Sequence, residues 1–519
     1  MEKNKAIVLS VIASLTLMLL LIGATYAYFQ AKTDSGSQTD VSITTYTVDV
    51  LSFETGDPLS FTIDQDNFAK DQDSLSASTF ASALLSANNK TNTATDHYYL
   101  YLNISNNSFV YSQDENTPEM ILTITSASGT PLTSIDGLTY KEVTDNKGTK
   151  ISGFDITTKN GLIPLLSNKE ISASPKTEEK WNVTITFINY NLDQSKNAGK
   201  DFTAKLMIQK EKMAQFLSDV CSSGSNLANC ITTLSQKSVS GATNIYYHDS
   251  SLANGAGDNS YRYAGANPDN FVCFGSDAST CPDDNLYRII GVIDGKVKLI
   301  KYDYANSNLL GTDGDYYGST TPASSYKGKL TSVNTYYWYK SNKNTWSASN
   351  LNKTNLNTNF INNIGATWTN KIATTTWKVG GNTWNNIASA IPSVAYQNEI
   401  TNPDATNTTD NATTYDAKIG LMYTSDYGFA ASPSAWTSTL YNYDSSSITS
   451  VNWMYMGGYE WTISRISDDS YDVFRVLTVG RVNYVIAGLY FAVRPSFNLT
   501  SSTRYVSGSG SMSDPIIIN

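Results

Sequence analysis

The longest apolar run of the chain lies at its start. Residues Ala6–Ile22 carry no charge and follow the basic lead Met1–Lys5. A basic lead, an apolar stretch and small residues up to Ala27 are typical of an export signal that is cleaved after Ala27. At seventeen residues the run also reaches the lower limit for a membrane span. Residues 1–27 are therefore predicted to be a signal peptide or a membrane anchor. We expect the rest of the chain to be extracellular or on the cell surface, touching the membrane only through residues 6–22.

The stretch 39–210 contains short segments in which hydrophobic and polar residues alternate. Alternation predicts strands, and several short strands with polar turns between them predict an antiparallel β-sandwich of jelly-roll type. The segment Leu75–Ser86 is predicted to be a helix laid across this sandwich. The predicted strands are Val41–Phe53, Tyr98–Ser105, Met120–Ser126, Trp181–Tyr190 and Phe202–Gln209.

The stretch 238–519 mixes hairpin patterns with helical ones. Leu286–Val292 and Val297–Tyr302 flank Asp294-Gly295, which predicts a β-hairpin with a two-residue turn. In Ser347–Ile364 the apolar residues recur near every fourth position, which predicts an amphipathic helix. One or two helices among many hairpins predict an α+β domain. The other predicted strands form a Gly-Gly hairpin at Trp377–Trp384 and four closing strands at Trp461–Ile466, Tyr471–Leu477, Arg481–Ile486 and Phe491–Leu499.

The composition changes sharply between these two stretches. No cysteine or arginine precedes Met213, and eight of the nine tryptophans follow it. We place the domain boundary at residues 211–237, where Phe216, Leu217 and Val220 share one face at helical spacing and predict a linker helix. The predicted order is a signal or anchor (1–27), a β-sandwich (39–210), the linker helix (211–237) and an α+β domain (238–519).

Charge and cysteine spacing narrow the function further. A net charge of −10 and a pI near 4.8 argue against nucleic-acid binding, because no basic patch offsets phosphate repulsion. The four cysteines form two close pairs, whose spacing does not match a zinc site. Outside the cell, two local disulfides are expected, Cys221 with Cys230 and Cys273 with Cys281.

The residues Gly23–Phe29 (GATYAYF), followed by strand patterns through Lys210, resemble the TasA/camelysin group of Gram-positive surface and biofilm-matrix proteins. The resemblance implies cleavage by a dedicated signal peptidase and a β-rich domain in a biofilm matrix. Camelysin-like proteins are described as metalloproteases. This chain has no HExxH motif, so the protease activity is not carried over.

Six segments of the second domain carry a recognisable pattern: Asn285–Ile300, Trp377–Gly381, Ile419–Ala431, Glu460–Ser464, Val493–Leu499 and Gly508–Ile518. They resemble a repeat-bearing ectodomain of Firmicutes and Mollicutes surface proteins. The terminal Trp and Val-Arg-Pro pattern is also similar to the C-type-lectin-like fold of formylglycine-generating-enzyme relatives, which implies a lectin-like fold here.

The sequence offers little for catalysis. His248, in the loop-like segment YYHDS, is predicted to be an isolated surface histidine, because no nucleophile motif accompanies it. Paired carboxylates could hydrolyse glycosides, but surface acidic pairs are common and the pairs here are better explained as turn residues. We therefore expect no enzymatic activity. The carboxylate candidates are Asp313 with Asp315, Asp468 with Asp469, and Glu460.

Calcium is the one cofactor that the sequence leaves open. Asp313 and Asp315 supply the oxygen ligands that extracellular calcium sites use. The tripeptide Asn-Pro-Asp, at Asn267–Asp269 and Asn402–Asp404, fits either a proline turn or a calcium- and sugar-binding tripeptide. Arg494 is predicted to be structural and to pair with a buried acid, either Asp426 or Glu460.

The tryptophans are the best lead to a ligand. Trp338, Trp436 and Trp453 lie among Tyr and Asn residues, a composition that suits sugar binding, although tryptophans are also common in cores. Trp436 and Trp453, in loop-like sequence, are predicted to be exposed, whereas Trp377 and Trp461 are predicted to be buried.

These patterns lead to three functional hypotheses. The first is adhesion to, or recognition of, a glycan or cell-wall polymer. The second is a matrix role in which Val41–Phe53 adds to the sheet edge of another copy. The third is an extracellular hydrolase.

Overall fold

The computed structural model describes residues 50–64, 67, 72–87, 93–238, 243–322, 326–402 and 411–519. The chain divides into two compact units between Lys212 and Met213, and each unit is described by itself. The predicted export signal, including Ala27, lies outside the described residues. Among the described residues, no helix has the length and hydropathy needed to cross a membrane.

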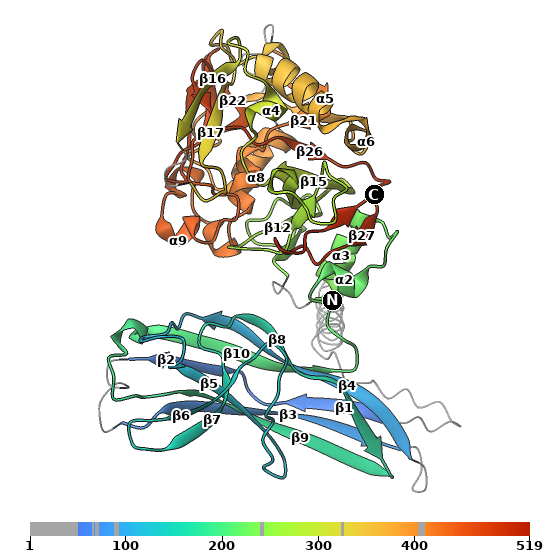
Figure 1. Cartoon of the computed structure of the whole chain (residues 1–519), viewed down its shortest axis with the longest axis vertical. Coiled ribbons are helices and arrows are strands. Elements are labelled where there is room, and N and C mark those ends of the chain that lie inside the picture. The colour runs from blue at the N-terminus through green and yellow to red at the C-terminus, as the bar shows by residue number, and fades with distance from the viewer. Residues whose placement is uncertain are drawn as a thin grey trace, which may run out of the picture. The chain divides into compact units, whose positions relative to one another are not determined.

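The N-terminal unit consists of antiparallel sheets, which confirms the expected β-rich character. Within the described residues one sheet has the order β1-β3-β9-β5-β7-β6 and the other β2-β10-β4-β8, and Figure 1 shows them as two layers of strands. The elements are β1 (Val50–Thr55), β2 (Leu59–Ile63), β3 (Leu75–Ser86), β4 (Ala94–Asn107), β5 (Met120–Ser126), β6 (Tyr140–Thr144), β7 (Lys150–Asp155), β8 (Gly161–Ala173), β9 (Lys176–Phe187), η2 (Ser195–Asn197) and β10 (Lys200–Gln209).

Alternating side chains of both sheets fill one core. In β4 the buried residues Leu100, Leu102 and Ile104 are two positions apart, as are Val183 and Ile185 in β9. Successive side chains of a strand point to opposite faces, so one face of each sheet is apolar. The core therefore lies between the two sheets.

The segment Leu75–Ser86 is strand β3, so the predicted helix is wrong. β3 pairs with β1 on one side and with β9 on the other. Ser76 bonds Thr186 and Ser78 bonds Thr184 across the strands, at 2.9 and 2.8 Å. The Ser- and Ala-rich sequence has only a weak intrinsic preference, and pairing on both edges decides the conformation.

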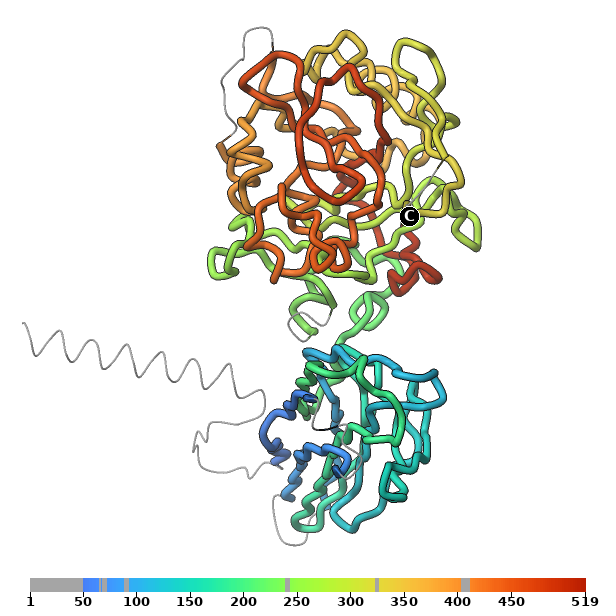
Figure 2. The backbone as a smooth tube through the Cα atoms, turned by 90° about the vertical axis from the view of Figure 1, so that its left-hand side faces the viewer, coloured from blue at the N-terminus to red at the C-terminus, as the bar shows by residue number. Residues whose placement is uncertain are grey.

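The C-terminal unit surrounds a larger core with several sheets and short helices. Within the described residues its main sheet has the order β11-β12-β14-β15-β26-β21, with β13 also paired to β14. Strands from the start and the end of the unit therefore lie side by side (Figures 1 and 2). Its strands are β11 (Ile245–His248), β12 (Ser260–Tyr263), β13 (Phe271–Cys273), β14 (Leu286–Ile293), β15 (Lys296–Lys301), β16 (Tyr317–Pro322), β17 (Ser332–Tyr337), β18 (Thr375–Lys378), β19 (Gly381–Asn382), β20 (Thr414–Ala417), β21 (Ile419–Gly420), β22 (Glu460–Ile466), β23 (Asp472–Val476), β24 (Val482–Ile486), β25 (Tyr490–Phe491), β26 (Ser496–Asn498), β27 (Tyr505–Ser507) and β28 (Ile517–Ile518).

The helices of this unit are short. They are α2 (Leu217–Val220), α3 (Leu227–Lys237), α4 (Ser307–Leu310), α5 (Ile361–Ile364), α6 (Ala366–Thr369), α7 (Pro392–Tyr396), α8 (Thr424–Phe429) and α9 (Ser446–Thr449), with the tighter or wider turns η3 (Asp283–Asn285), η4 (Trp346–Ala348), η5 (Leu351–Phe360), η6 (Gln397–Thr401), η7 (Pro433–Ala435) and η8 (Leu440–Asn442).

The hairpin predicted at Asp294-Gly295 is confirmed. β14 and β15 pair antiparallel, and both turn residues have positive φ, 50° and 70°. A two-residue turn of this type matches the twist of the flanking strands, and Asp-Gly is a favoured pair for it. The turn therefore fixes the register at the centre of the main sheet.

The predicted helix Ser347–Ile364 is helical but not a regular α-helix. The π-helix η5 precedes α5. Asparagine side chains bond main-chain carbonyls here: Asn352 Nδ2 donates to Trp346, Asn355 Nδ2 to Leu310 and Asn357 Nδ2 to Asn352. Side-chain amides that compete for backbone carbonyls favour such departures from the α-helix.

The Gly-Gly hairpin predicted at Trp377–Trp384 is wrong. β18 pairs with β20, and β19 pairs in parallel with β22. Trp377 is buried, its indole N–H donates to the carbonyl of Ala417, and its ring packs so closely on Gly420 that a side chain there would clash. Burial of this tryptophan, rather than the local turn, selects the partner strand.

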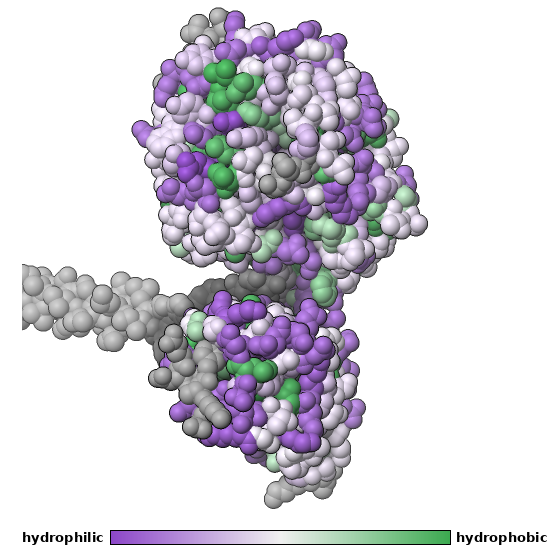
Figure 3. Space-filling model, turned by 60° about the vertical axis from the view of Figure 1, so that its left-hand side comes forward, coloured by the Kyte–Doolittle hydropathy of each residue, from purple (hydrophilic) through white to green (hydrophobic). Residues whose placement is uncertain are grey.

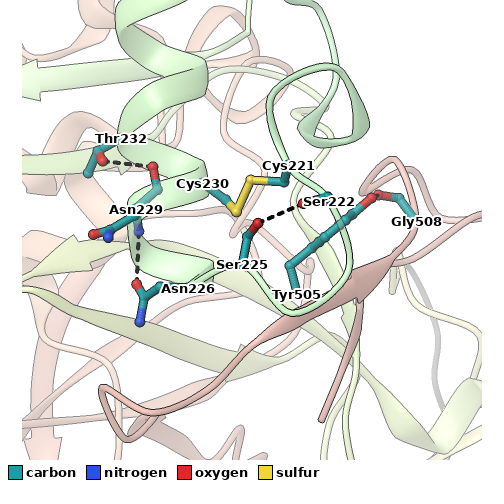
Figure 4. Close-up of a disulfide and its surroundings, with 9 residues drawn as sticks. All are labelled: Cys221, Ser222, Ser225, Asn226, Asn229, Cys230, Thr232, Tyr505 and Gly508. Carbon is teal, nitrogen blue, oxygen red and sulfur yellow. Dashed lines mark hydrogen bonds between the residues drawn. A yellow bond between two sulfur atoms is a disulfide. The ribbon is translucent and has the colours of Figure 1, made fainter.

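Both predicted disulfides are present. Cys221–Cys230 and Cys273–Cys281 each join Cα atoms 5.7 Å apart, and Figure 4 shows the first one beside Tyr505. The Gly224 N–H donates to the Tyr505 carbonyl, and the Tyr505 N–H donates to Ser225, both at 2.8 Å. The first disulfide therefore holds the start of the unit against β27.

The segment predicted as a linker helix, 211–237, is packed into the C-terminal unit. Leu217, Leu227, Ile231 and Leu234 are buried in its core. The unit thus begins near Met213, and a fragment that starts at Ser238 would lack part of the core.

We predict that the double variant Cys221→Ala/Cys230→Ala lowers the unfolding free energy of this unit by about 2–3 kcal/mol, from the chain entropy of a loop of this length. Urea unfolding followed by tryptophan fluorescence measures it, because eight of nine tryptophans lie in this unit. The Cys273–Cys281 disulfide closes a loop of almost equal length, so Cys273→Ala/Cys281→Ala is expected to give a similar loss. An unchanged unfolding midpoint for both variants would contradict the prediction.

Candidate functional site

An aromatic cleft with a volume of about 310 Å³ opens in the C-terminal unit. Its walls combine aromatic rings, threonine hydroxyls and glycine backbone, and none of the residues that line it is charged. They are Tyr304, Thr321, Pro322, Tyr326, Val333, Thr335, Gly457, Gly458, Tyr459, Thr478, Tyr490, Phe491 and Ala492.

Strand pairing and one buried tryptophan position the rings of the cleft. β25 pairs with β17, which places Phe491 opposite Tyr336. The indole N–H of Trp461 donates to the Tyr336 carbonyl at 2.7 Å, and its ring centroid lies 4.6 Å from that of Phe491. Trp461 is fully buried, so its contacts with Tyr336 and Phe491 hold the aromatic side of the cleft in place.

Two tyrosines present their rings to solvent at the cleft. Tyr459 is 42% exposed and Tyr490 is 41% exposed, whereas most large apolar side chains are buried. On the surface of the C-terminal unit, hydrophobic residues form small patches among polar ones (Figure 3). The guanidinium of Arg475 lies 4.8 Å from the Tyr459 ring centroid and 4.6 Å from that of Phe491, a cation–π arrangement that holds both rings in place.

The inner part of the cleft is polar as well as aromatic. Tyr304 and Tyr326 stack with centroids 5.0 Å apart. Within the described residues the buried Tyr326 hydroxyl has no hydrogen-bond partner, and it lies against Gly328. A Cβ on Gly458 would lie 2.6 Å from the Tyr304 hydroxyl, so only glycine leaves room for this ring. The cleft thus offers flat apolar faces and nearby hydroxyls, a combination typical of small-molecule sites.

The three tryptophans predicted to bind ligand are buried. Trp338 and Trp436 are 0% exposed and Trp453 is 4% exposed, so the predicted exposure of Trp436 and Trp453 is wrong. Each indole N–H donates to a main-chain carbonyl, of Thr462, Ala431 and Tyr263 respectively. The loop-like sequence around Trp436 and Trp453 is compatible with burial, because β11 packs on Trp436 through Tyr246 and His248 and Arg288 of β14 lies over the Trp453 ring. The predicted burial of Trp377 and Trp461 is confirmed.

The predicted calcium pair forms a turn. The Asp313 carboxylate accepts the Asp315 N–H at 2.8 Å, and the Asp315 carboxylate lies 3.9 Å from the ammonium of Lys340. Where the structure describes the chain, no cluster of three or more His, Cys, Asp or Glu side chains could hold a metal ion. The Pro268 carbonyl accepts from Arg288 Nη2, which makes Asn267–Asp269 a structural turn. Asp404, in the second copy, lies outside the described residues.

The other carboxylate candidates have structural partners. Asp469 accepts the N–H groups of Tyr471 and Asp472 in the turn before β23. Both oxygens of Glu460 bind Arg494, at 2.7 and 2.9 Å, and both residues are buried. The prediction that Arg494 pairs with a buried acid is therefore confirmed, with Glu460 as the partner.

His248 is buried, so its predicted surface position is wrong. Its Nδ1 accepts the Ala256 N–H at 3.0 Å, and its ring packs against Phe429 and Trp436. Burial, together with the positive charge of Arg262, lowers the pKa of His248 to about 3. The histidine is therefore neutral and part of the core.

We predict that His248 makes the C-terminal unit sensitive to acid. The unfolded chain binds a proton at this residue below a pKa of about 6.5, and the folded chain does so only near pH 3. The stabilising contribution is therefore complete above pH 6.5 and decreases as the pH falls, by about 3 kcal/mol at pH 4. Asp258 and Arg262 face the same cluster, and their ion pair persists over this range.

Urea unfolding at pH 7 and pH 4, followed by tryptophan fluorescence, measures the effect. His248→Asn, which keeps an acceptor near the position of Nδ1, is expected to lose less stability between the two pH values than the wild type. His97→Asn, at the exposed histidine of the other unit, is the control. An equal loss of unfolding free energy between pH 7 and pH 4 in the wild type and in His248→Asn would contradict the prediction.

The sequence reasoning did not single out Tyr459 and Tyr490. The only local signal is the pair Gly457-Gly458 before Tyr459, which permits close approach of a ring. Comparisons of the chain with known protein families, with curated proteins and with solved structures found no match. The proposal below therefore rests on the geometry of the cleft.

Proposed function

We propose that this chain is an exported, non-enzymatic recognition protein whose C-terminal unit binds a neutral glycan in the aromatic cleft. One observation carries the proposal: two half-exposed tyrosine rings border a cleft with no charged lining residue. The glycan is free or part of a cell-wall polymer. The two disulfides are in keeping with an extracellular location.

Sugar rings match the cleft in shape and polarity. One face of a pyranose carries C–H groups that pack on an aromatic ring, while its hydroxyls seek hydrogen-bond partners at the edge. The threonines Thr321 and Thr478 in the lining supply such partners. A volume of about 310 Å³ is at the low end for small-molecule sites and suits one or two sugar units.

The proposal includes an architecture for each unit. The N-terminal unit serves as a stalk of jelly-roll type, similar to that of the TasA/camelysin group. The C-terminal unit serves as a lectin-like head.

The matrix hypothesis required a free strand at Val41–Phe53. Val50–Phe53 is already paired with β3, with Val50 opposite Ser86 and Phe53 opposite Ala83. Among the described residues β1 is the edge strand of its sheet, so this part is paired on one side only, and residues 41–49 lie outside them. Assembly of several copies of the chain into fibres is one possible outcome of the test described next.

The test is an array of neutral glycans and cell-wall polymer fragments probed with the purified chain. Saturable binding to neutral sugars supports the proposal. Binding only to anionic polymers, or to no glycan at all, contradicts it. Electron microscopy of the same preparation shows whether the chain forms fibres. Fibres, together with no binding on the array, would favour the matrix role.

A further inference from the structure

A second cavity in the C-terminal unit has more basic than acidic residues in its lining. It has a volume of about 340 Å³ and shares no lining residue with the aromatic cleft. Four cationic side chains and two carboxylates line it, in a chain whose net charge is −10. We call it the basic cavity; its charged residues are Arg262, Asp294, Lys296, Lys298, Lys378 and Asp426.

A shared carboxylate holds the deepest cations of the basic cavity. Arg262, Lys298 and Asp426 are 2%, 4% and 3% exposed. The Asp426 carboxylate bonds Lys298 Nζ at 2.6 Å and Arg262 Nη1 at 3.4 Å, and it also accepts the Tyr423 N–H at the start of α8. Asp258 binds the other end of Arg262 at 2.7 Å. The floor of the cavity is therefore held rigidly by charge-assisted bonds.

Lys298 has donors left for a ligand. An ammonium carries three N–H donors, and in the described part of the chain Asp426 is the one hydrogen-bond acceptor found for it. The ammonium also lies 4.7 Å from the Tyr423 ring centroid and 5.5 Å from that of Trp377, and these rings accept no conventional hydrogen bond. An oxyanion in the cavity would therefore satisfy the remaining donors of a buried cation.

The rim of the cavity adds charge and neutral polar groups. Lys296 and Lys378 are half-buried there, and they add positive charge near the opening. The neutral groups are hydroxyls and an amide, from Thr374, Thr375, Thr376 and Asn498. This combination fits a ligand that has one acidic group and several hydroxyls.

We propose that the basic cavity binds a sugar acid, with its carboxylate at Lys298 and its hydroxyls at the threonine rim. The volume of the cavity accommodates one sugar ring. The site is independent of the neutral-glycan site in the aromatic cleft, because the two have no residue in common. The chain would thus bind acidic and neutral sugars at separate places.

Isothermal titration calorimetry of the purified chain with D-glucuronate, D-glucose and inorganic phosphate tests the ligand class. We expect saturable binding of glucuronate, and affinities at least about tenfold lower for glucose and for phosphate. Equal affinity for glucose that is also weakened in the Lys298 and Lys378 variants described below would remove the role of the carboxylate, because glucose bound in the aromatic cleft does not depend on these lysines. Equal affinity for phosphate would identify a general anion site, and no binding of glucuronate at millimolar concentration would overturn the proposal.

Three variants test the location. Lys298→Met keeps the aliphatic stem and is expected to weaken glucuronate binding at least about thirtyfold. Lys378→Met, at the rim, is expected to weaken it about three- to tenfold and to leave the fold unchanged, so it decides the matter if Lys298→Met does not fold. Lys329→Met, whose exposed ammonium pairs with Asp283, is the control. Unchanged affinity in Lys378→Met and in any folded Lys298→Met would overturn the proposal.

Discussion

Glu460→Gln is expected to destabilise the C-terminal unit by about 3–5 kcal/mol, the cost of breaking a buried ion pair by removing one partner. The substitution preserves the shape of the side chain but removes the charge that faces Arg494. Burial alone would lower the pKa of Arg494. The negative charge of Glu460 and its hydrogen bonds have the larger, opposite effect, so the pKa is raised. Arginine does not lose its proton in proteins, so the variant leaves a buried cation without a counter-charge.

Asp283→Asn provides the matched control for this prediction. Asp283 pairs with Lys329, and their side chains are 64% and 44% exposed. Exposed pairs contribute about 0–1 kcal/mol. Urea unfolding followed by tryptophan fluorescence measures both variants. Losses of similar, small size in the two variants would show that the buried pair has no special role.

Tyr459→Ala and Tyr490→Ala are each expected to weaken binding of a neutral glycan about thirtyfold. Truncating a central aromatic side chain of an interface typically costs about 2 kcal/mol or more. Both rings border the cleft and are already ordered, Tyr459 by Arg475 and Tyr490 by an edge contact with Tyr337 at 5.5 Å. Little ordering entropy is therefore lost when a sugar binds them.

Tyr484→Ala is the control for the cleft variants. Tyr484, on β24, is 42% exposed, like Tyr459, but it does not line the cleft. We expect its glycan affinity to equal that of the wild type, as measured by calorimetry with a glycan identified on the array. If all three variants bind equally well, the sugar does not bind in the aromatic cleft.

Short sequence motifs correctly predicted the structural features that depend only on neighbouring residues. The Asp294-Gly295 turn and both disulfides are fixed by short-range geometry, and the structure contains all three. The pairing of Arg494 with a buried acid was also predictable, because a buried cation needs a counter-charge. The sequence could not predict that the partner is Glu460 rather than Asp426, because the partner depends on which segments pack together in the fold.

Features that depend on long-range packing could not be predicted in this way. Leu75–Ser86 has a helix-like composition, but pairing with both β1 and β9 makes it a strand. Trp436 lies in loop-like sequence and is nevertheless buried against Phe429 and His248. Lys298 alternates with apolar residues as an outward-facing strand residue would, but β15 is covered on both faces. The basic cavity was therefore invisible in the sequence.

Hydrogen exchange of the chain with and without its glycan tests the central claim most directly. The proposed function predicts that added protection is confined to the segments that form the aromatic cleft. These are residues 457–461 and 489–493, the facing strands β16 and β17, and the stretches around Tyr304, Tyr326 and Thr478. Protection in the N-terminal unit, or in the C-terminal unit away from these segments, would contradict binding in the cleft.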